Sequence, residues 1–100
     1  MISRENLTDS TLIALGRQLK ADGATYNRYF VYVFTDKEAA TTLRDNMMNL
    51  NEADYRRFCQ NNVAVYTKNV NSSLNEFGYS LGGMCADDKD QASRWKKIKY

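Results

Sequence analysis

The sequence predicts a small α+β domain, in which a largely antiparallel sheet of about three strands packs against three or four helices. A run of β-branched and aromatic residues at 28–34 indicates a strand. Apolar residues recur at helical spacing before and after it, and a second strand-like run at 63–81 contains turn-forming residues. An all-α bundle is the alternative. The length suits one domain, spanning 1–100.

The first helix is predicted from Thr8 to Ala21. Leu12, Leu15 and Leu19 recur at helical spacing along this segment. Thr8 is a candidate amino-terminal cap, because its hydroxyl can accept a hydrogen bond from a free backbone N–H of the first turn. Gly23 follows the predicted end and suits the left-handed conformation that often closes a helix.

The strand at 28–34 is predicted to be apolar on both faces. Alternate side chains point to opposite sides of a strand, so one side carries Phe30, Tyr32 and Phe34 and the other Tyr29, Val31 and Val33. Such a strand needs cover on both faces, from helices or from a second protein. It also needs a partner strand, because its backbone N–H and C=O groups must be hydrogen-bonded.

Two further helices are predicted between 35 and 62. Thr35 and Glu38 have the spacing of a capping box, which predicts a helix that begins at Thr35 and reaches Leu50. A break at 49–51 precedes a short third helix that opens with Glu52 and ends at 61–62.

The segment 63–81 permits two interpretations. Its apolar residues step by three and four as in a helix, whereas 63–67 has the composition of a strand. A hairpin is favoured, with strands at 63–68 and 76–81, because the asparagines and serines between them favour turns. Such a hairpin would also supply the partner that the strand at 28–34 requires.

The tail at 84–100 is predicted to form a loosely docked C-terminal helix after a flexible joint at Gly82 and Gly83. Acidic residues come first in this tail and basic residues last, an order that suits a helix dipole. Trp95 and Ile98 lie three positions apart and would dock the helix on the core. Whether the tail is structural or functional is left open.

Composition argues against an enzyme and against a cofactor or metal. The chain contains no histidine, the usual base for serine and cysteine nucleophiles and the commonest metal ligand. It lacks the glycine-rich loops that bind phosphates and the cysteine spacing of zinc sites. No catalytic, cofactor-binding or metal-ligating residue is therefore predicted.

The predicted location is the cytoplasm. No apolar run is long enough to cross a bilayer, and the first residues lack the apolar core of a signal peptide, so no membrane association is expected. In that compartment Cys59 and Cys85 are expected to be reduced thiols.

The favoured function is a small non-enzymatic protein-binding module, of the kind with which phage or mobile-element proteins modulate or inhibit a larger host protein. The partner would be another protein or a second copy of the chain. Tyrosine and arginine are enriched at protein interfaces. The candidate interface residues are Tyr26, Arg28, Tyr29 and Tyr32.

A nucleic-acid-binding accessory protein is the alternative function. Its basic, aromatic C-terminal tail would contact phosphates and stack on bases. A second basic group lies on the predicted helices, although solvated helix faces often carry such residues. The candidate contact residues are Arg44, Arg56, Arg57, Arg94, Trp95, Lys96, Lys97 and Lys99.

Overall fold

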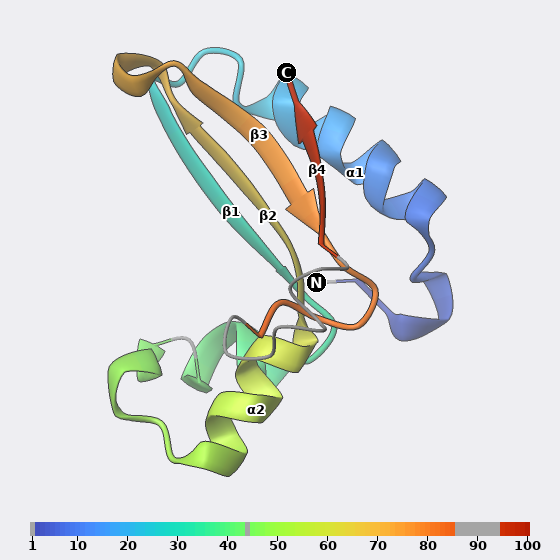
Figure 1. Ribbon diagram of the computed structural model, residues 1–100, viewed down its shortest axis with the longest axis vertical. Coiled ribbons are helices and arrows are strands. Elements are labelled where there is room, and N and C mark those ends of the chain that lie inside the picture. Colours follow the sequence, from blue (N-terminus) through green and yellow to red (C-terminus); the bar gives the residue numbers. More distant parts are fainter. Residues whose placement is uncertain (1, 44, 86–94) are drawn as a thin grey trace.

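The computed structural model describes residues 2–43, 45–85 and 95–100. Its centre is an antiparallel four-stranded sheet in the order β1-β2-β3-β4. The strands span Arg28–Phe34 (β1), Asn62–Asn69 (β2), Leu74–Tyr79 (β3) and Lys96–Lys99 (β4). Helix α1 (Asp9–Asp22) runs along one face of this sheet, and α2 (Glu52–Asn61) lies at one end (Figure 1). The α+β prediction is confirmed, and the all-α alternative is wrong.

Helix α1 begins where the sequence predicts it to begin. Thr8 caps it, and the hydroxyls of Thr8 and Thr11 each accept a hydrogen bond from the other residue's backbone N–H. The prediction of a left-handed Gly23 is wrong, because this residue has a φ of −89°. Glycine is needed there for space: a Cβ on Gly23 would lie 2.3 Å from the Tyr29 ring.

The predicted hairpin is confirmed as β2 and β3. A short turn over Val70–Ser72 (η4) joins the two strands, and Ser73 closes it in the left-handed region with a φ of 56°. β2 also pairs with β1, in a register that places Tyr66 opposite both Val31 and Phe77. The hairpin therefore supplies the partner that the apolar strand β1 requires.

Within the segment 84–100, where a helix was predicted, the described residues 95–100 contain a strand, and 86–94 lie outside the described residues. Lys96–Lys99 pairs with β3 as β4, and Ile98 lies opposite Phe77. Spacing explains the difference, because Ile98 and Tyr100 are two residues apart and both pack against the core. Pairing also satisfies the outer backbone groups of β3, which a docked helix would leave open. The sheet thereby gains its fourth strand.

The main core lies between α1 and the sheet. Tyr66 and Phe77 are fully buried at its centre, and Gly16 lets the helix approach Phe77 closely. The buried residues of this core are Leu12, Leu19, Val33, Val63, Ala64, Tyr66, Phe77 and Tyr79. Val33 of β1 belongs to this core, whereas Tyr29 and Val31 on the same face are half-buried, so α1 covers this face of β1 in part.

The helix predicted from Thr35 to Leu50 is replaced by shorter helical segments. A π-helical segment covers Ala39–Leu43 (η2), and a 3₁₀ turn covers Met47–Asn49 (η3). The hydroxyl of Thr41 donates to the carbonyl of Lys37, a side-chain bond that competes with regular helix geometry. The predicted capping box is also absent, since the Thr35 hydroxyl donates to Asn61 while the Asp36 carboxylate accepts from the Glu38 backbone N–H.

Helix α2 has the bounds that the sequence predicts, and the Asn51 side chain caps it by accepting from the Asp54 N–H. The expectation of reduced thiols is wrong, because Cys59 of α2 and Cys85 form a disulfide. Their Cα atoms lie 4.9 Å apart, a separation that suits the bond. Gly83 makes this approach possible, since a Cβ there would lie 2.4 Å from the Gln60 carbonyl oxygen.

Candidate functional site

The sheet has a second face, on the side away from α1, which we call the open face. Side chains alternate along each strand, and paired residues share a face, so the register identifies its members. From β1 to β4 they are Arg28, Phe30, Tyr32, Val65, Thr67, Asn69, Leu74, Glu76, Gly78, Lys97 and Lys99. Two rows cross all four strands, one from Phe30 to Lys99 and the other from Tyr32 to Lys97.

Two large aromatic side chains stand on the open face of β1. Phe30 is 52% exposed and Tyr32 is 47% exposed, although side chains of this size are normally covered. Thr67 lies opposite Phe30, and Val65 lies opposite Tyr32. The cover that the sequence predicts for both faces of β1 is therefore found on the α1 side, where Val33 is buried and Tyr29 and Val31 are half-buried, whereas the two rings of the other face are about half exposed. Phe34 is the exception, because it enters a small separate core with Ala39 and Leu43.

The four predicted interface residues do not share one surface. Arg28 and Tyr32 belong to the open face. Tyr29 points to the other side, where its ring meets Tyr66 edge to face at 5.9 Å. Tyr26 is 56% exposed and stacks on Tyr29 at 5.5 Å, before β1 begins. Phe30 was not among the predicted residues, although the two-residue period places it beside Tyr32 and would have identified it.

The tyrosines under α1 have structural roles. Tyr66 is fully buried, and its hydroxyl donates to the Asn75 side chain. Burial raises the pKa of the Tyr66 hydroxyl above its ordinary value of 10.0. Tyr100 stacks on Tyr66, and the ammonium of Lys20 lies 4.9 Å from the Tyr100 ring centroid. These rings build the core and offer no surface for a ligand.

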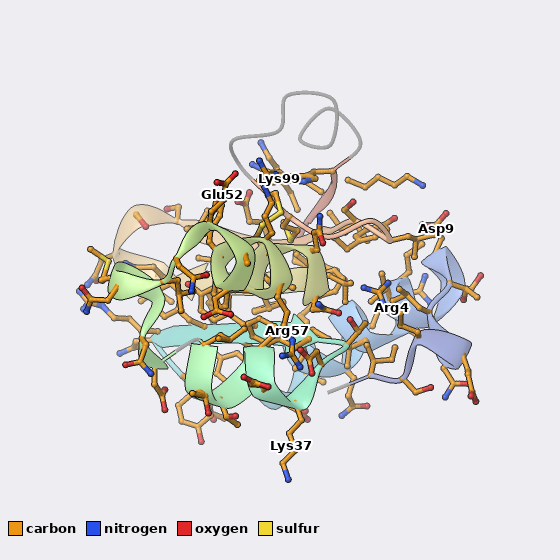
Figure 2. All side chains as sticks on the ribbon, turned by 90° about the horizontal axis from the view of Figure 1, so that it is seen from below. Arg4, Asp9, Lys37, Glu52, Arg57 and Lys99 are labelled. Atoms are coloured by element: carbon orange, nitrogen blue, oxygen red, sulfur yellow. A yellow bond between two sulfur atoms is a disulfide. The ribbon has the colours of Figure 1, made fainter. Side chains whose placement is uncertain are left out.

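The predicted basic patch on the helices is divided and partly neutralised. The Arg57 side chain is half exposed and forms ion pairs with Asp36 at 2.5 Å and with Glu38 at 2.9 Å. Figure 2 shows Arg57 between α2 and the helical segment that carries Lys37. Arg56 lies on α2 and is half-buried. Arg44 lies outside the described residues.

The predicted basic tail is also split between the two faces of the sheet. Lys96 lies on the α1 side, where its ammonium pairs with Asp9 at 3.1 Å. That pair raises the pKa of the Lys96 ammonium. Lys97 and Lys99 belong to the open face, with Lys97 3.9 Å from the Glu76 carboxylate. Trp95 is half-buried, and Arg94 lies outside the described residues.

Residues 2–43, 45–85 and 95–100 contain neither a candidate metal site nor a candidate membrane span. No three residues among histidine, cysteine, aspartate and glutamate gather there as a metal site would require. No helix in those ranges has the length and apolar character needed to cross a membrane. The open face and the adjoining edge of β1 are therefore the candidate functional site.

Comparison with known proteins adds no assignment to this geometry. No protein-family model, curated protein or solved structure matches the chain.

Proposed function

We propose that the protein is a small, non-enzymatic protein-binding module whose contact surface is the β1 half of the open face. The exposure of Phe30 and Tyr32, side by side on a rigid strand, is the observation that carries this proposal. Aromatic side chains held by a strand bury a large area at little entropic cost when a partner covers them. Arg28 beside them adds the cation that is enriched at such interfaces.

The partner would be a larger host protein, whose activity this chain modulates or inhibits in the manner of phage or mobile-element proteins. The open face supports this role, because two exposed rings on one strand act most simply by covering a surface of another protein. Binding would depend on apolar contact. We therefore expect it to change little with moderate salt.

Affinity capture from cell extract, with and without nuclease and read by mass spectrometry, tests the proposal. The informative variant is Thr67→Glu, which places a carboxylate directly opposite Phe30 on the open face. A partner that buries this face would have to bury the new charge, so we expect at least a tenfold loss of captured protein. Nuclease should leave the capture unchanged.

The matched control is Met48→Glu. Met48 is 89% exposed on η3, remote from the sheet, and this variant adds the same charge. It should retain the captured protein at the level of the unmodified chain. Equal capture by all three proteins would contradict binding through the open face, and a monomer that captures no specific protein would contradict the protein-binding function itself.

Nucleic-acid binding is the second candidate, favoured by one observation. Lys99 and Lys97 continue the two rows that begin at Phe30 and Tyr32, so bases stacked on the rings would leave phosphates within reach of lysines. Glu76 stands in the first row and opposes such binding. This candidate is therefore placed second.

A labelled single-stranded oligonucleotide tests this second candidate by titration over a range of salt concentrations. Replacing Lys97 and Lys99 together by alanine should reduce the slope of log K against log salt by about 1.4, because each neutralised phosphate contributes about 0.7 on single strands. Lys96→Ala is the control, since Lys96 lies on the other face and pairs with Asp9. An unchanged slope in the double variant would reject the lysine contacts.

The compartment is part of the proposal. The disulfide between Cys59 and Cys85 favours an oxidising compartment over the predicted cytoplasm, because cytoplasmic thiols are generally kept reduced. Acid quenching of intact cells, followed by alkylation in denaturant, decides between the two, because both sulfur atoms are buried in the folded chain and would be shielded there even as thiols. A protected pair indicates the disulfide and the oxidising compartment, and two alkylated cysteines indicate the cytoplasm.

A further inference from the structure

β1 forms an edge of the sheet, and its outer backbone groups can be identified. The N–H of Val70 donates to the carbonyl of Asn27, so in this antiparallel pair the odd-numbered residues of β1 bond to β2. The N–H and C=O groups of Arg28, Phe30 and Tyr32 therefore point away from the sheet. At the far end of the strand, Ile2 donates from its N–H to the carbonyl of Phe34 and closes that position.

The two edges of the sheet differ in their protection against pairing. β4 has four residues, of which Lys96, Lys97 and Lys99 are charged, and lysines on a short edge strand discourage the addition of another strand. β1 has seven residues and one charge, that of Arg28. It contains no proline and is rich in β-branched and aromatic residues. β1 is thus the edge that is suited to accept a further strand.

A groove of about 550 Å³ runs beside this edge, between α1 and β1. The residues of α1 that line it are uncharged, and they are Thr11, Ala14, Leu15, Gln18 and Leu19. The charged residues Arg17 and Lys20 of α1 do not line it. A strand added to β1 would therefore direct alternate side chains into an uncharged groove and onto the open face.

We propose that the occupant of this edge is β1 of a second copy, paired antiparallel about a two-fold axis at Phe30. The proposal rests on the protein-binding function and specifies how the binding surface is assembled. The three residues with outward backbone groups are symmetric about Phe30, so Phe30 faces its counterpart and Arg28 faces Tyr32 of the second copy. A two-fold interface requires this kind of self-complementarity.

The neighbours of Arg28 favour this register. It places the guanidinium of Arg28 against the Tyr32 ring of the second copy, which is a favourable cation–π pair. The two Arg28 residues stay about 13 Å apart, the rise of four strand residues. Shifting the axis to Val31 would bring Arg28 opposite Phe34 of the second copy, whose carbonyl Ile2 already occupies. The proposed dimer has one continuous sheet, with the exposed rings of both copies gathered at its middle.

Sedimentation equilibrium of the full chain tests the dimer, with Phe30→Pro and Phe30→Thr as the paired variants. Proline at position 30 removes an outward N–H and leaves the bonds to β2 intact, so the fold should survive. Threonine removes the ring and keeps the N–H. We expect a concentration-dependent dimer for the unmodified chain, a monomer for Phe30→Pro, and a dimer weakened by about tenfold or less for Phe30→Thr.

Cysteine cross-linking tests the register and does not depend on the proline variant. The two native cysteines are bonded to each other, so an introduced cysteine is the one reduced thiol in the chain. Phe30→Cys should give a covalent dimer, because opposite residues in a hydrogen-bonded pair have Cα atoms about 5.5 Å apart. Tyr32→Cys should not, because its counterpart lies about 13 Å away. Met48→Cys reports the background from collisions.

The outcomes separate this proposal from the proposed function. A monomer at all concentrations, a Phe30→Pro dimer as strong as the original, or cross-linking by Tyr32→Cys at the level of Phe30→Cys would overturn the edge dimer. Thr67 lies on β2, away from the edge, so loss of a captured protein in Thr67→Glu supports the binding function whether or not the chain dimerises. A register-specific dimer that captures no other protein would support the edge dimer and contradict the host-protein partner.

Discussion

Gly16 and Gly78 are both buried glycines with ordinary backbone angles, yet they have different reasons to be glycine. Gly16 lies in α1 where the helix crosses the sheet, and a Cβ there would lie 2.7 Å from the Phe77 ring and 3.0 Å from the Tyr100 hydroxyl oxygen. Gly78 lies in β3 on the open face, where the nearest atom to a Cβ would be a Met84 carbon at 3.5 Å. There is no room for a methyl group at Gly16, whereas there is room for one at Gly78.

Gly16→Ala should therefore lower the free energy of unfolding. Overpacking a core costs about 1 to 3 kcal/mol, and the better helix propensity of alanine returns up to about 1 kcal/mol. We expect a net loss of up to about 2 kcal/mol in urea unfolding. Gly78→Ala is the control, and it should be neutral or stabilising by up to about 1 kcal/mol. Similar losses in both variants would show that crowding at Gly16 is not the cause.

At the scale of elements, an ion pair joins the helical segment after β1 to α2. The Arg57 guanidinium donates to both carboxylate oxygens of Asp36, at 2.5 and 3.2 Å. This hydrogen bonding lowers the pKa of the Asp36 carboxyl below its ordinary value of 3.8. The Asp36 carboxylate also accepts from the backbone N–H of Glu38, so one side chain both caps a helical turn and holds it to α2.

The contribution of this pair should depend on pH in a defined direction. Because the folded pKa of Asp36 lies below the unfolded value, the stabilisation is present above about pH 3.9 and is lost as the pH falls through the folded pKa. A double-mutant cycle of Asp36→Asn and Arg57→Gln measures it. Asparagine at position 36 keeps a side-chain oxygen that can accept from the Glu38 N–H, so the coupling energy of the cycle reports the charge interaction between positions 36 and 57. We expect a small favourable coupling near neutral pH, since the pair is partly exposed, and a weaker coupling as the pH falls through the folded pKa of Asp36. Equal coupling at both pH values would contradict an ionic origin.

The elements that the sequence predicted well carry a clear local signal. α1 combines a cap with a helical stripe, α2 begins at a capping asparagine, and β1 is an unbroken run of aromatic and β-branched residues after Arg28. The segment at 39–43 could not be predicted, because its side-chain bonds to backbone carbonyls compete with the helix. β4 could not be predicted either, since four residues show too little of a period and their pairing depends on the distant strand β3.

The candidate site was predicted in part for the same reason. The period of β1 identifies two apolar faces, but which face α1 covers is decided by contacts between residues far apart in the chain. Tyr29 therefore packs against the main core, whereas Phe30 on the opposite face is exposed. The disulfide is a similar case, because the packing of Gly83 on Gln60 and the Met84–Cys59 backbone bond hold Cys85 near Cys59. The spacing of residues in the sequence does not reveal such contacts between distant segments.

At the scale of the whole molecule, the described residues form two cores of unequal size. The larger lies between α1 and the sheet, and the smaller consists of Phe34, Ala39 and Leu43 with neighbours that include Phe58 of α2. The disulfide ties Cys59 of α2 to the segment that follows β3. A backbone bond from the Met84 N–H to the Cys59 carbonyl lies beside it. Since three buried residues supply little hydrophobic stabilisation, the disulfide should be what keeps the α2 end closed.

Reduction of the disulfide should therefore loosen one end of the molecule before the rest. A disulfide that closes a loop of this length typically contributes about 2 to 4 kcal/mol, so amide protection in Glu52–Asn61 should fall by about 30-fold or more under reducing conditions. Amides of β2 and β3 at the centre of the sheet should lose far less, because the larger core does not depend on the bond. Native-state hydrogen exchange measures both. A variant with Cys59→Ala and Cys85→Ala should show the loosened pattern without reductant and no response to it. If protection fell by the same factor in α2 and in the sheet, the two cores would form a single cooperative unit.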